Sequence, residues 1–281
     1  MTKDEFGDLL AEIGGGHEIG IVSRHERDAA EHATLSTHET EIWGLLCLGD
    51  ALHQFYRDTL GLVGQALSTK TVNPSETAMA HWHLVSFNRF AAAFHLMANG
   101  YYFEAMMLAR DLWEVGLTLA SLQKNVVTLD ELLATGTTPS ETESLSRKVD
   151  QKIRKVLIYE NQALSPDARG AVETFGRLAN LATHKSKLQM GMNLGLMVKK
   201  EPILLFPHFD LKRAEVAHNL LFMGSWALLS TLPCLAFALP PSEVGWHTMY
   251  GKVQTAFQFG LASGPNAAVQ AWPEVIQRVF G

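Results

Sequence analysis

The spacing of hydrophobic residues predicts α-helices along most of the chain. Between residues 27 and 67, which contain no proline, apolar side chains recur at three- and four-residue steps, and one long or once-bent helix fits this pattern. The same spacing predicts further helices at residues 78–99, 101–125, 145–157, 166–182 and from 210 onward, with weaker helices around 246–259 and 266–280. Apolar residues surround the helical wheel from 78 to 99, which predicts a central, buried helix.

One segment breaks the helical period. Apolar residues occupy every second position from 188 to 198, and a polar turn at 199–202 precedes a second apolar run that ends at 206. Strict alternation is typical of a strand with one buried face. We therefore expect a β-hairpin over residues 188–206.

The predicted fold is mainly α: a multi-helix bundle with one inserted β-hairpin. With 281 residues and 47% hydrophobic residues, the chain has enough apolar material for one large core. We expect a single domain over residues 1–281, in which 1–30 form a peripheral N-terminal segment and 242–281 form C-terminal helices.

A membrane span is not expected. Residues 220–239 carry no charge and are long enough to cross a bilayer, but Pro233 and several hydroxyl residues interrupt them, which favours a core helix. Residues 1–5 are acidic and no apolar run follows, so we expect no secretory signal. The two cysteines, Cys47 and Cys234, each lie in an apolar run, which favours a reducing, cytoplasmic location.

Charge is distributed unevenly along the chain. The net charge is −6, but residues 147–213 hold 13 Lys+Arg and 6 Asp+Glu, whereas residues 1–146 have a net charge of −12. Such a basic region can hold the phosphates of RNA. The candidate contacts are Lys148, Lys152, Lys155, Lys185 and Lys187. The alternative is a solvated basic face that pairs with the acidic part of the chain.

The 12 histidines make a metal site one chemistry to test. Asp50 with His53, and Glu215 with His218, have the carboxylate-x-x-histidine spacing that directs two ligands into a helix bundle. The further inward carboxylates that a di-metal site needs would be Glu114 and Glu39. Because chance alone yields about one such pair in a chain of this composition, we expect no metal and no cofactor, and the di-metal bundle stays an alternative.

Arg177 and His184 lie seven positions apart near the end of a predicted helix in the basic region. Seven residues make almost two turns, so both side chains should leave the same outward face. An arginine there can bind phosphate while a histidine that titrates near neutral pH moves a proton, the combination needed to cleave RNA without a metal. The structural alternative is a Glu173–Arg177 ion pair with His184 at the negative end of the helix dipole.

An arginine followed some residues later by a histidine, on a helix of an all-α bundle, resembles the motif of HEPN ribonucleases. The resemblance implies a metal-independent endoribonuclease whose active site forms where two protomers meet. Arg177 would bind the phosphate and the transition state, and His184 would be the general acid and base. Leu178 departs from the polar residue that usually follows the arginine in that family.

A second resemblance concerns residues 100–114 and a later Thr183-His184-Lys185 turn. This combination is similar to uncharacterised all-helical bacterial proteins with an R-x-x-x-E helix and a downstream histidine, and it implies a fold without a particular activity. Arg110 and Glu114 stand one turn apart on an otherwise apolar helix, so we expect them to form a partly buried pair. That pair either locks the helix register or faces His184 in a site across the bundle.

These patterns lead to one expected function and two alternatives. The expectation is a cytoplasmic helical-bundle protein that acts by binding or assembly, with its long apolar helices supporting a homodimer. The first alternative is the HEPN-like ribonuclease that uses Arg177 and His184. The second is the di-metal carboxylate and histidine bundle.

Overall fold

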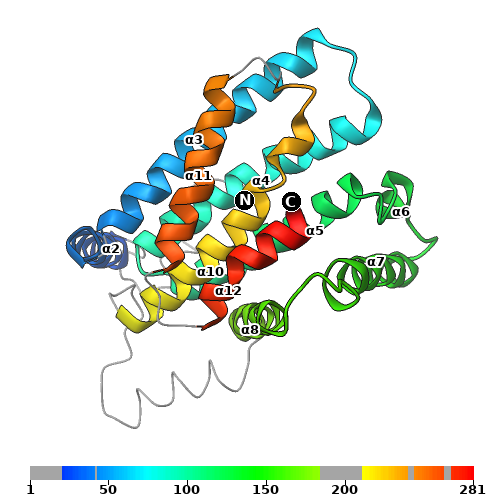
Figure 1. The fold of residues 1–281 in the computed structure, drawn as a ribbon. Coiled ribbons are helices and arrows are strands. Elements are labelled where there is room, and N and C mark those ends of the chain that lie inside the picture. The colour runs from blue at the N-terminus through cyan, green and yellow to red at the C-terminus, as the bar shows by residue number, and fades with distance from the viewer. Residues whose placement is uncertain (1–20, 42, 184–210, 240–243, 263–266) are drawn as a thin grey trace, which may run out of the picture.

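The computed structural model of the chain describes residues 21–41, 43–183, 211–239, 244–262 and 267–281 (Figure 1). The elements in these ranges are helices: α2 (Ile21–Glu41), α3 (Trp43–Thr69), α4 (Pro74–Ala98), α5 (Tyr102–Gln123), α6 (Leu129–Leu133), α7 (Pro139–Arg154), η1 (Lys155–Tyr159), α8 (Pro166–Thr183), α10 (Leu211–Leu229), η2 (Leu232–Leu235), α11 (Val244–Ala262), α12 (Ala267–Val275) and η3 (Ile276–Phe280). The mainly α prediction is confirmed, and the described ranges contain no strand. The hairpin predicted for residues 188–206 lies outside them.

Local sequence signals fix the ends of α4, which begins at Pro74, four residues before the predicted start at 78, and ends at Ala98. The Asn73 side chain accepts a hydrogen bond from the Glu76 backbone at 2.9 Å, and the Glu76 side chain accepts one from the Asn73 backbone at 3.0 Å. This reciprocal pair satisfies two free amides of the first turn. At the other end Gly100 has a φ of 86°, a left-handed conformation that glycine adopts without a steric penalty. The chain then turns directly into α5.

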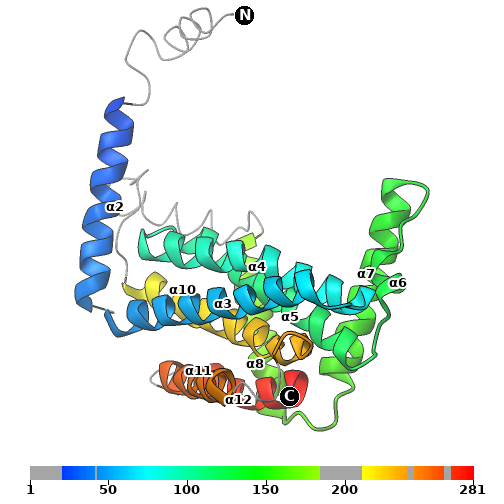
Figure 2. The same cartoon turned by 90° about the horizontal axis from the view of Figure 1, so that it is seen from above.

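The helix predicted for residues 27–67 is divided in two. α2 and α3 meet at a steep angle around residue 42, so the prediction of one long helix is wrong and its once-bent version describes the path better (Figure 2). α2 is fixed to the bundle by polar contacts. The Tyr102 hydroxyl lies 3.1 Å from His38 Nε2, and the Tyr101 hydroxyl donates to Glu31 at 2.6 Å.

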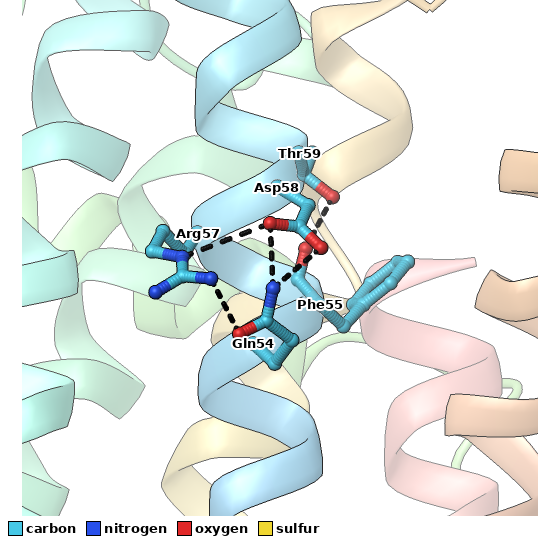
Figure 3. Close-up of polar contacts among 5 residues, drawn as sticks. All are labelled: Gln54, Phe55, Arg57, Asp58 and Thr59. Atoms are coloured by element: carbon cyan, nitrogen blue, oxygen red, sulfur yellow. Dashed lines mark hydrogen bonds and ion pairs between the residues drawn. The ribbon is translucent and has the colours of Figure 1, made fainter.

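Helix α3 has one solvent-exposed polar face and one buried face (Figure 3). On the exposed face, the Gln54 amide donates to both Asp58 oxygens at 2.8 Å and accepts from Arg57 at 2.6 Å. On the inner face, Phe55 and Thr59 are buried, and the Thr59 hydroxyl accepts a hydrogen bond from Trp246 of α11 at 2.9 Å. The exposed triad is a surface network within one helix, and the inner pair fastens α11 to α3.

Helices α5 and α10 form the centre of the bundle. α5 packs against α10, α4 and α8 (Figure 1). Gly116 and Gly224 let the two central helices approach closely, because a Cβ at Gly224 would stand 2.2 Å from the carbonyl oxygen of Ala109. α4, predicted to be buried on all sides, is buried along one stripe only, since Leu84 and Val85 are 41% and 37% exposed. That prediction is wrong because the elements that pack against α4, chiefly α5 and α3, leave part of its apolar surface uncovered.

The uncharged stretch 220–239 is a core element. α10 ends at Leu229, and after Ser230 and Thr231 the chain continues in η2, which contains Pro233. The side chains from Leu220 to Leu229 are buried against the other helices. Within the described part of the chain, no helix is long and apolar enough to cross a membrane. The core-helix interpretation is confirmed.

The C-terminal helices predicted around 246–259 and 266–280 are confirmed as α11 and as α12 followed by η3. α12 packs beside α8 (Figure 1). Trp272 lies between Trp113 of α5 and Phe175 of α8, with ring centroids 5.0 and 5.3 Å apart, and Phe280 contacts Trp113 at 5.4 Å. The end of the chain thus covers the side of the core on which α5 and α8 meet.

Candidate functional site

A partly enclosed cavity of about 300 Å³ lies between α5, α7 and α8. Its wall combines three charged side chains with an amide and an apolar floor. The lining residues are Arg110, Trp113, Glu114, Arg154, Val172, Phe175, Gly176 and Asn180. Trp113 and Phe175 are buried and belong to the aromatic cluster around Trp272, so the floor of the cavity is fixed by the core.

The charged groups of this cavity converge on one oxygen atom. Arg110 Nε lies 3.8 Å from Glu114 Oε1, one turn further along α5, and the Arg154 guanidinium donates a hydrogen bond to the same oxygen. The three side chains are 31%, 35% and 32% exposed, so each can still meet a ligand from solvent. The predicted Arg110–Glu114 pair is confirmed.

Arg154 is the residue that sequence reasoning missed. It lies at the end of α7, and only the packing of α7 against α5 brings it to a carboxylate 40 positions earlier. The available signal was its place in the basic run from 147 to 155, which predicted a general positive face and no particular partner. Local spacing cannot identify a partner from another helix.

The charged groups of the cavity are suited to contact an anion. Two guanidinium groups and one carboxylate leave a local charge of +1, and arginine stays protonated at any ordinary pH. A guanidinium presents a planar set of N–H donors that matches the oxygens of a carboxylate or phosphate. Asn180 adds a neutral amide, while Val172 and Gly176 leave an apolar wall.

Arg177 lies outside this cavity. It is exposed on α8, whereas Phe175 and Ala179 on the same helix are buried. The prediction that Arg177 faces away from the core is confirmed. α8 ends at Thr183, and His184 lies outside the described residues, so the proposed pairing of Arg177 with His184 stays a prediction.

Much of the basic face on α7 is paired with carboxylates. Lys152 donates to Glu131 of α6 at 2.6 Å, which lowers the pKa of Glu131, and Arg147 pairs with Glu143 at 2.6 Å. Lys155 pairs with Glu160 at 3.3 Å, while Lys148 is exposed. Lys185 and Lys187 lie outside the described residues. These contacts support the alternative of a solvated, paired basic face over a free phosphate-binding surface.

The histidine and carboxylate pairs do not gather into one site. Asp50 and His53 line a separate cavity of about 660 Å³, together with Cys47 and His95. Glu215 is exposed, whereas His218 is 2% exposed and neither of its ring nitrogens has a hydrogen-bond partner.

The two extra carboxylates suggested for a di-metal site do not complete it either. Glu114 contacts arginines, and the Glu39 side chain lies outside the described part. Within the described part of the chain, no three His, Cys, Asp or Glu side chains are close enough to hold a metal ion. No carboxylate and histidine cluster is therefore available there for a di-metal centre.

Another group that sequence reasoning missed is a buried polar cluster around His83. The Tyr56 hydroxyl lies 2.9 Å from both His83 Nδ1 and the His83 carbonyl oxygen, and Thr231 Oγ1 lies 3.3 Å from His83 Nε2. Burial lowers the pKa of His83 to about 3 and raises that of the neighbouring Cys234 to about 12. Both groups are therefore neutral, and the cluster joins α3, α4 and η2 as a structural network.

Fold and cavity together define a mainly α bundle with a guanidinium and carboxylate site in its wall. Comparison of the chain with models of known protein families, with curated proteins and with solved structures found no match. The chemistry of the cavity is therefore the basis for a functional conclusion.

Proposed function

We propose that the protein is a binding protein that holds the carboxylate or phosphate group of a small ligand in the cavity between α5, α7 and α8. The supporting observation is that guanidinium groups from two different helices converge on one oxygen of Glu114 at the cavity wall. Glu114 then serves as an internal counter-ion that keeps Arg110 and Arg154 in place while the ligand is absent. This proposal keeps the binding role that the sequence favours.

The exposure of the three side chains supports a ligand site over a purely structural ion pair. Ion pairs that remain about one-third open to water add little stability, of the order of 1 kcal/mol or less. Arg154 uses one nitrogen to reach Glu114, which leaves further N–H donors for ligand oxygens. A cavity of about 300 Å³ suits a compact metabolite that carries a carboxylate or phosphate group.

The test is isothermal titration calorimetry of the full chain at low salt, with inorganic phosphate and with succinate as probes. Arg154→Gln should weaken binding by about tenfold or more, because a charge-assisted hydrogen bond is lost. Arg147→Gln is the matched control, since Arg147 lies on the same helix and also pairs with a glutamate, but is 72% exposed and away from the cavity. Equal losses in both variants, or no binding of either probe, would overturn the proposal.

Glu114→Gln separates a ligand site from a structural pair. Removing the negative charge of Glu114 raises the local positive charge beside Arg110 and Arg154, so the affinity for phosphate should rise several-fold as the variant loses some thermal stability. A structural pair predicts the loss of stability with no gain in affinity. Circular dichroism melting and calorimetry on the same preparation measure both quantities.

A second candidate function is the metal-independent ribonuclease, in which Arg177 binds phosphate and His184 transfers the proton. Two features of α8 support this candidate. Asn180 lines the cavity that holds two arginines, and in the sequence His184 directly follows Thr183, the last residue of that helix. The active site would be shared between the two subunits of a homodimer.

The ribonuclease candidate is tested with single-stranded RNA in the presence of a chelator. The wild-type chain should cleave the RNA, whereas His184→Ala and Arg177→Ala should lose cleavage without a change in melting temperature. Sedimentation of the same sample should show a dimer. Absence of cleavage by the wild type, or full activity of His184→Ala, would exclude this function and leave the anion-binding proposal untouched.

A further inference from the structure

A third cavity, of about 510 Å³, lies between α10, α11 and the C-terminal elements α12 and η3. It shares no lining residue with the Arg110 cavity. Aromatic rings and glutamine amides dominate its wall, among them Trp226, Tyr250, Gln254, Gln258, Gln277 and Phe280. Among the described residues that line it, none is a lysine, arginine or histidine, and Glu274 supplies a carboxylate.

Two polar groups in this wall are buried without hydrogen-bond partners. The Trp226 indole N–H donates to Gln254 Oε1, which fixes the amide and leaves Gln254 Nε2 buried with no acceptor. The Ser230 hydroxyl, on a residue that is 7% exposed, also has no partner. Trp226 is held in turn by Phe257, whose ring stacks on it at 5.5 Å. A buried polar group without a partner costs about 1–3 kcal/mol, so its presence in a cavity wall indicates a missing ligand or ordered water.

The carboxylate of this cavity is anchored. Each Glu274 oxygen accepts a hydrogen bond from Ser165, one from the backbone at 2.7 Å and one from the hydroxyl at 2.8 Å. These bonds lower the pKa of Glu274, which therefore stays charged at neutral pH. Arg278, which also lowers this pKa, does not line the cavity, so the charge in the described wall is negative and disfavours anionic ligands.

We propose that this cavity binds a neutral, polyhydroxylated ligand, a sugar or a polyol. Each hydroxyl of such a ligand both donates and accepts, as the amides of Gln254, Gln258 and Gln277 do. A ligand hydroxyl, directly or through one ordered water, supplies the partner that Gln254 Nε2 and Ser230 Oγ lack. The C–H faces of the ligand pack on the apolar parts of the wall, which include Tyr250.

The experiment uses four probes with the full chain: glucose, trehalose, myo-inositol and glucose 6-phosphate. Saturation-transfer NMR and tryptophan fluorescence should show saturable binding of at least one neutral probe in the millimolar range or tighter. In the Arg154→Gln variant, whose anion cavity is weakened, glucose 6-phosphate should bind at least tenfold more weakly than glucose, because Glu274 repels its phosphate. Absence of saturable binding by all three neutral probes, or a preference for the phosphate in that variant, would overturn the proposal.

Three variants locate the binding. Gln258→Ala and Gln277→Ala change exposed side chains of the wall, and each should lower the affinity for the neutral probe by about fivefold. Gln151→Ala, an exposed glutamine on α7, is the matched control and should bind normally. Ser230→Ala removes a hydroxyl without a partner, so affinity should fall while the melting temperature stays the same or rises. Unchanged affinity in all three wall variants would place the sugar elsewhere and refute this site.

Discussion

Two buried histidines show how packing sets the protonation state of single side chains. His83 and His218 are 0% and 2% exposed, and burial lowers the pKa of each to about 3. Their surroundings differ. His83 has hydroxyl partners, whereas His218 stacks on Phe222 with ring centroids 5.9 Å apart, and the nearby His38 lowers its pKa further. A histidine count gives no hint of this difference, because it does not show what packs around each ring.

Acid should destabilise the protein through these two histidines. Their folded pKa values lie below the ordinary value of 6.5, so the unfolded chain binds more protons between pH 6.5 and 3. Their contribution to stability is complete above pH 6.5 and falls by up to about 1.4 kcal/mol per pH unit and histidine on acidification. Urea unfolding at several pH values measures how the free energy of unfolding falls with pH. His218→Met should reduce this slope by about the contribution of one histidine.

The same variant should not lose stability at neutral pH, because it removes a buried ring whose nitrogens have no partner. His81→Met is the control, since His81 is exposed on α4. An unchanged acid slope in His218→Met would contradict this account of the buried histidine.

At the scale of elements, the central contact depends on small residues at the crossing of α5 and α10. Gly224 faces the backbone of Ala109, and Gly116 faces the backbone of Ala227 at 3.1 Å from a hypothetical Cβ. Backbone atoms at such distances cannot yield as a flexible side chain can. The spacing of the two helices is therefore set by the absence of side-chain atoms at these positions.

Gly224→Ala should destabilise the protein by about 1–3 kcal/mol, because the added methyl group meets the Ala109 carbonyl oxygen at 2.2 Å. Urea unfolding monitored by circular dichroism measures the change. Gly64→Ala in α3 is the matched control, since a Cβ there meets no atom within 4 Å, and it should gain roughly 0.5–1 kcal/mol from helix propensity. Similar effects of both substitutions would argue against the close crossing.

At the scale of the whole molecule, one continuous core joins the C-terminal helices to the middle of the described chain. Trp272 is completely buried, contacts the rings of Trp113 and Phe175, and donates a hydrogen bond to the Met223 carbonyl at 3.2 Å. It thus ties α12 to α5, α8 and α10. The same aromatic cluster forms the floor of the Arg110 cavity, so the C-terminal helix supports that site from behind.

Trp272→Ala should lower the free energy of unfolding by about 3–5 kcal/mol, as expected for removal of a large buried ring. Met249→Ala on α11 is the control: Met249 is 47% exposed, and its loss should change stability by no more than about 0.5 kcal/mol. Urea unfolding followed by far-UV circular dichroism reports on all helices at once. A small effect of Trp272→Ala would mean that α12 is peripheral to the core.

The sequence by itself determined the features that depend on near neighbours in the chain. Helical periodicity, the Asn73–Glu76 cap and the stop at Gly100 follow from hydrogen bonds and side-chain contacts within a few residues. The Arg110–Glu114 pair belongs to the same class, because residues four apart always share a helix face. The lack of charge in residues 220–239, interrupted by Pro233 and hydroxyl residues, also indicated a core element.

Only the tertiary structure decided which helix faces cover one another. Arg154 joins Glu114 across 40 positions, and Thr231 reaches His83 across 148. α4 is as apolar as a central helix, yet it leaves Leu84 and Val85 exposed. A periodic pattern predicts that one face of a helix will be buried. Which helix covers that face depends on how all the helices pack together in the core. That global packing condition is absent from any local stretch of sequence.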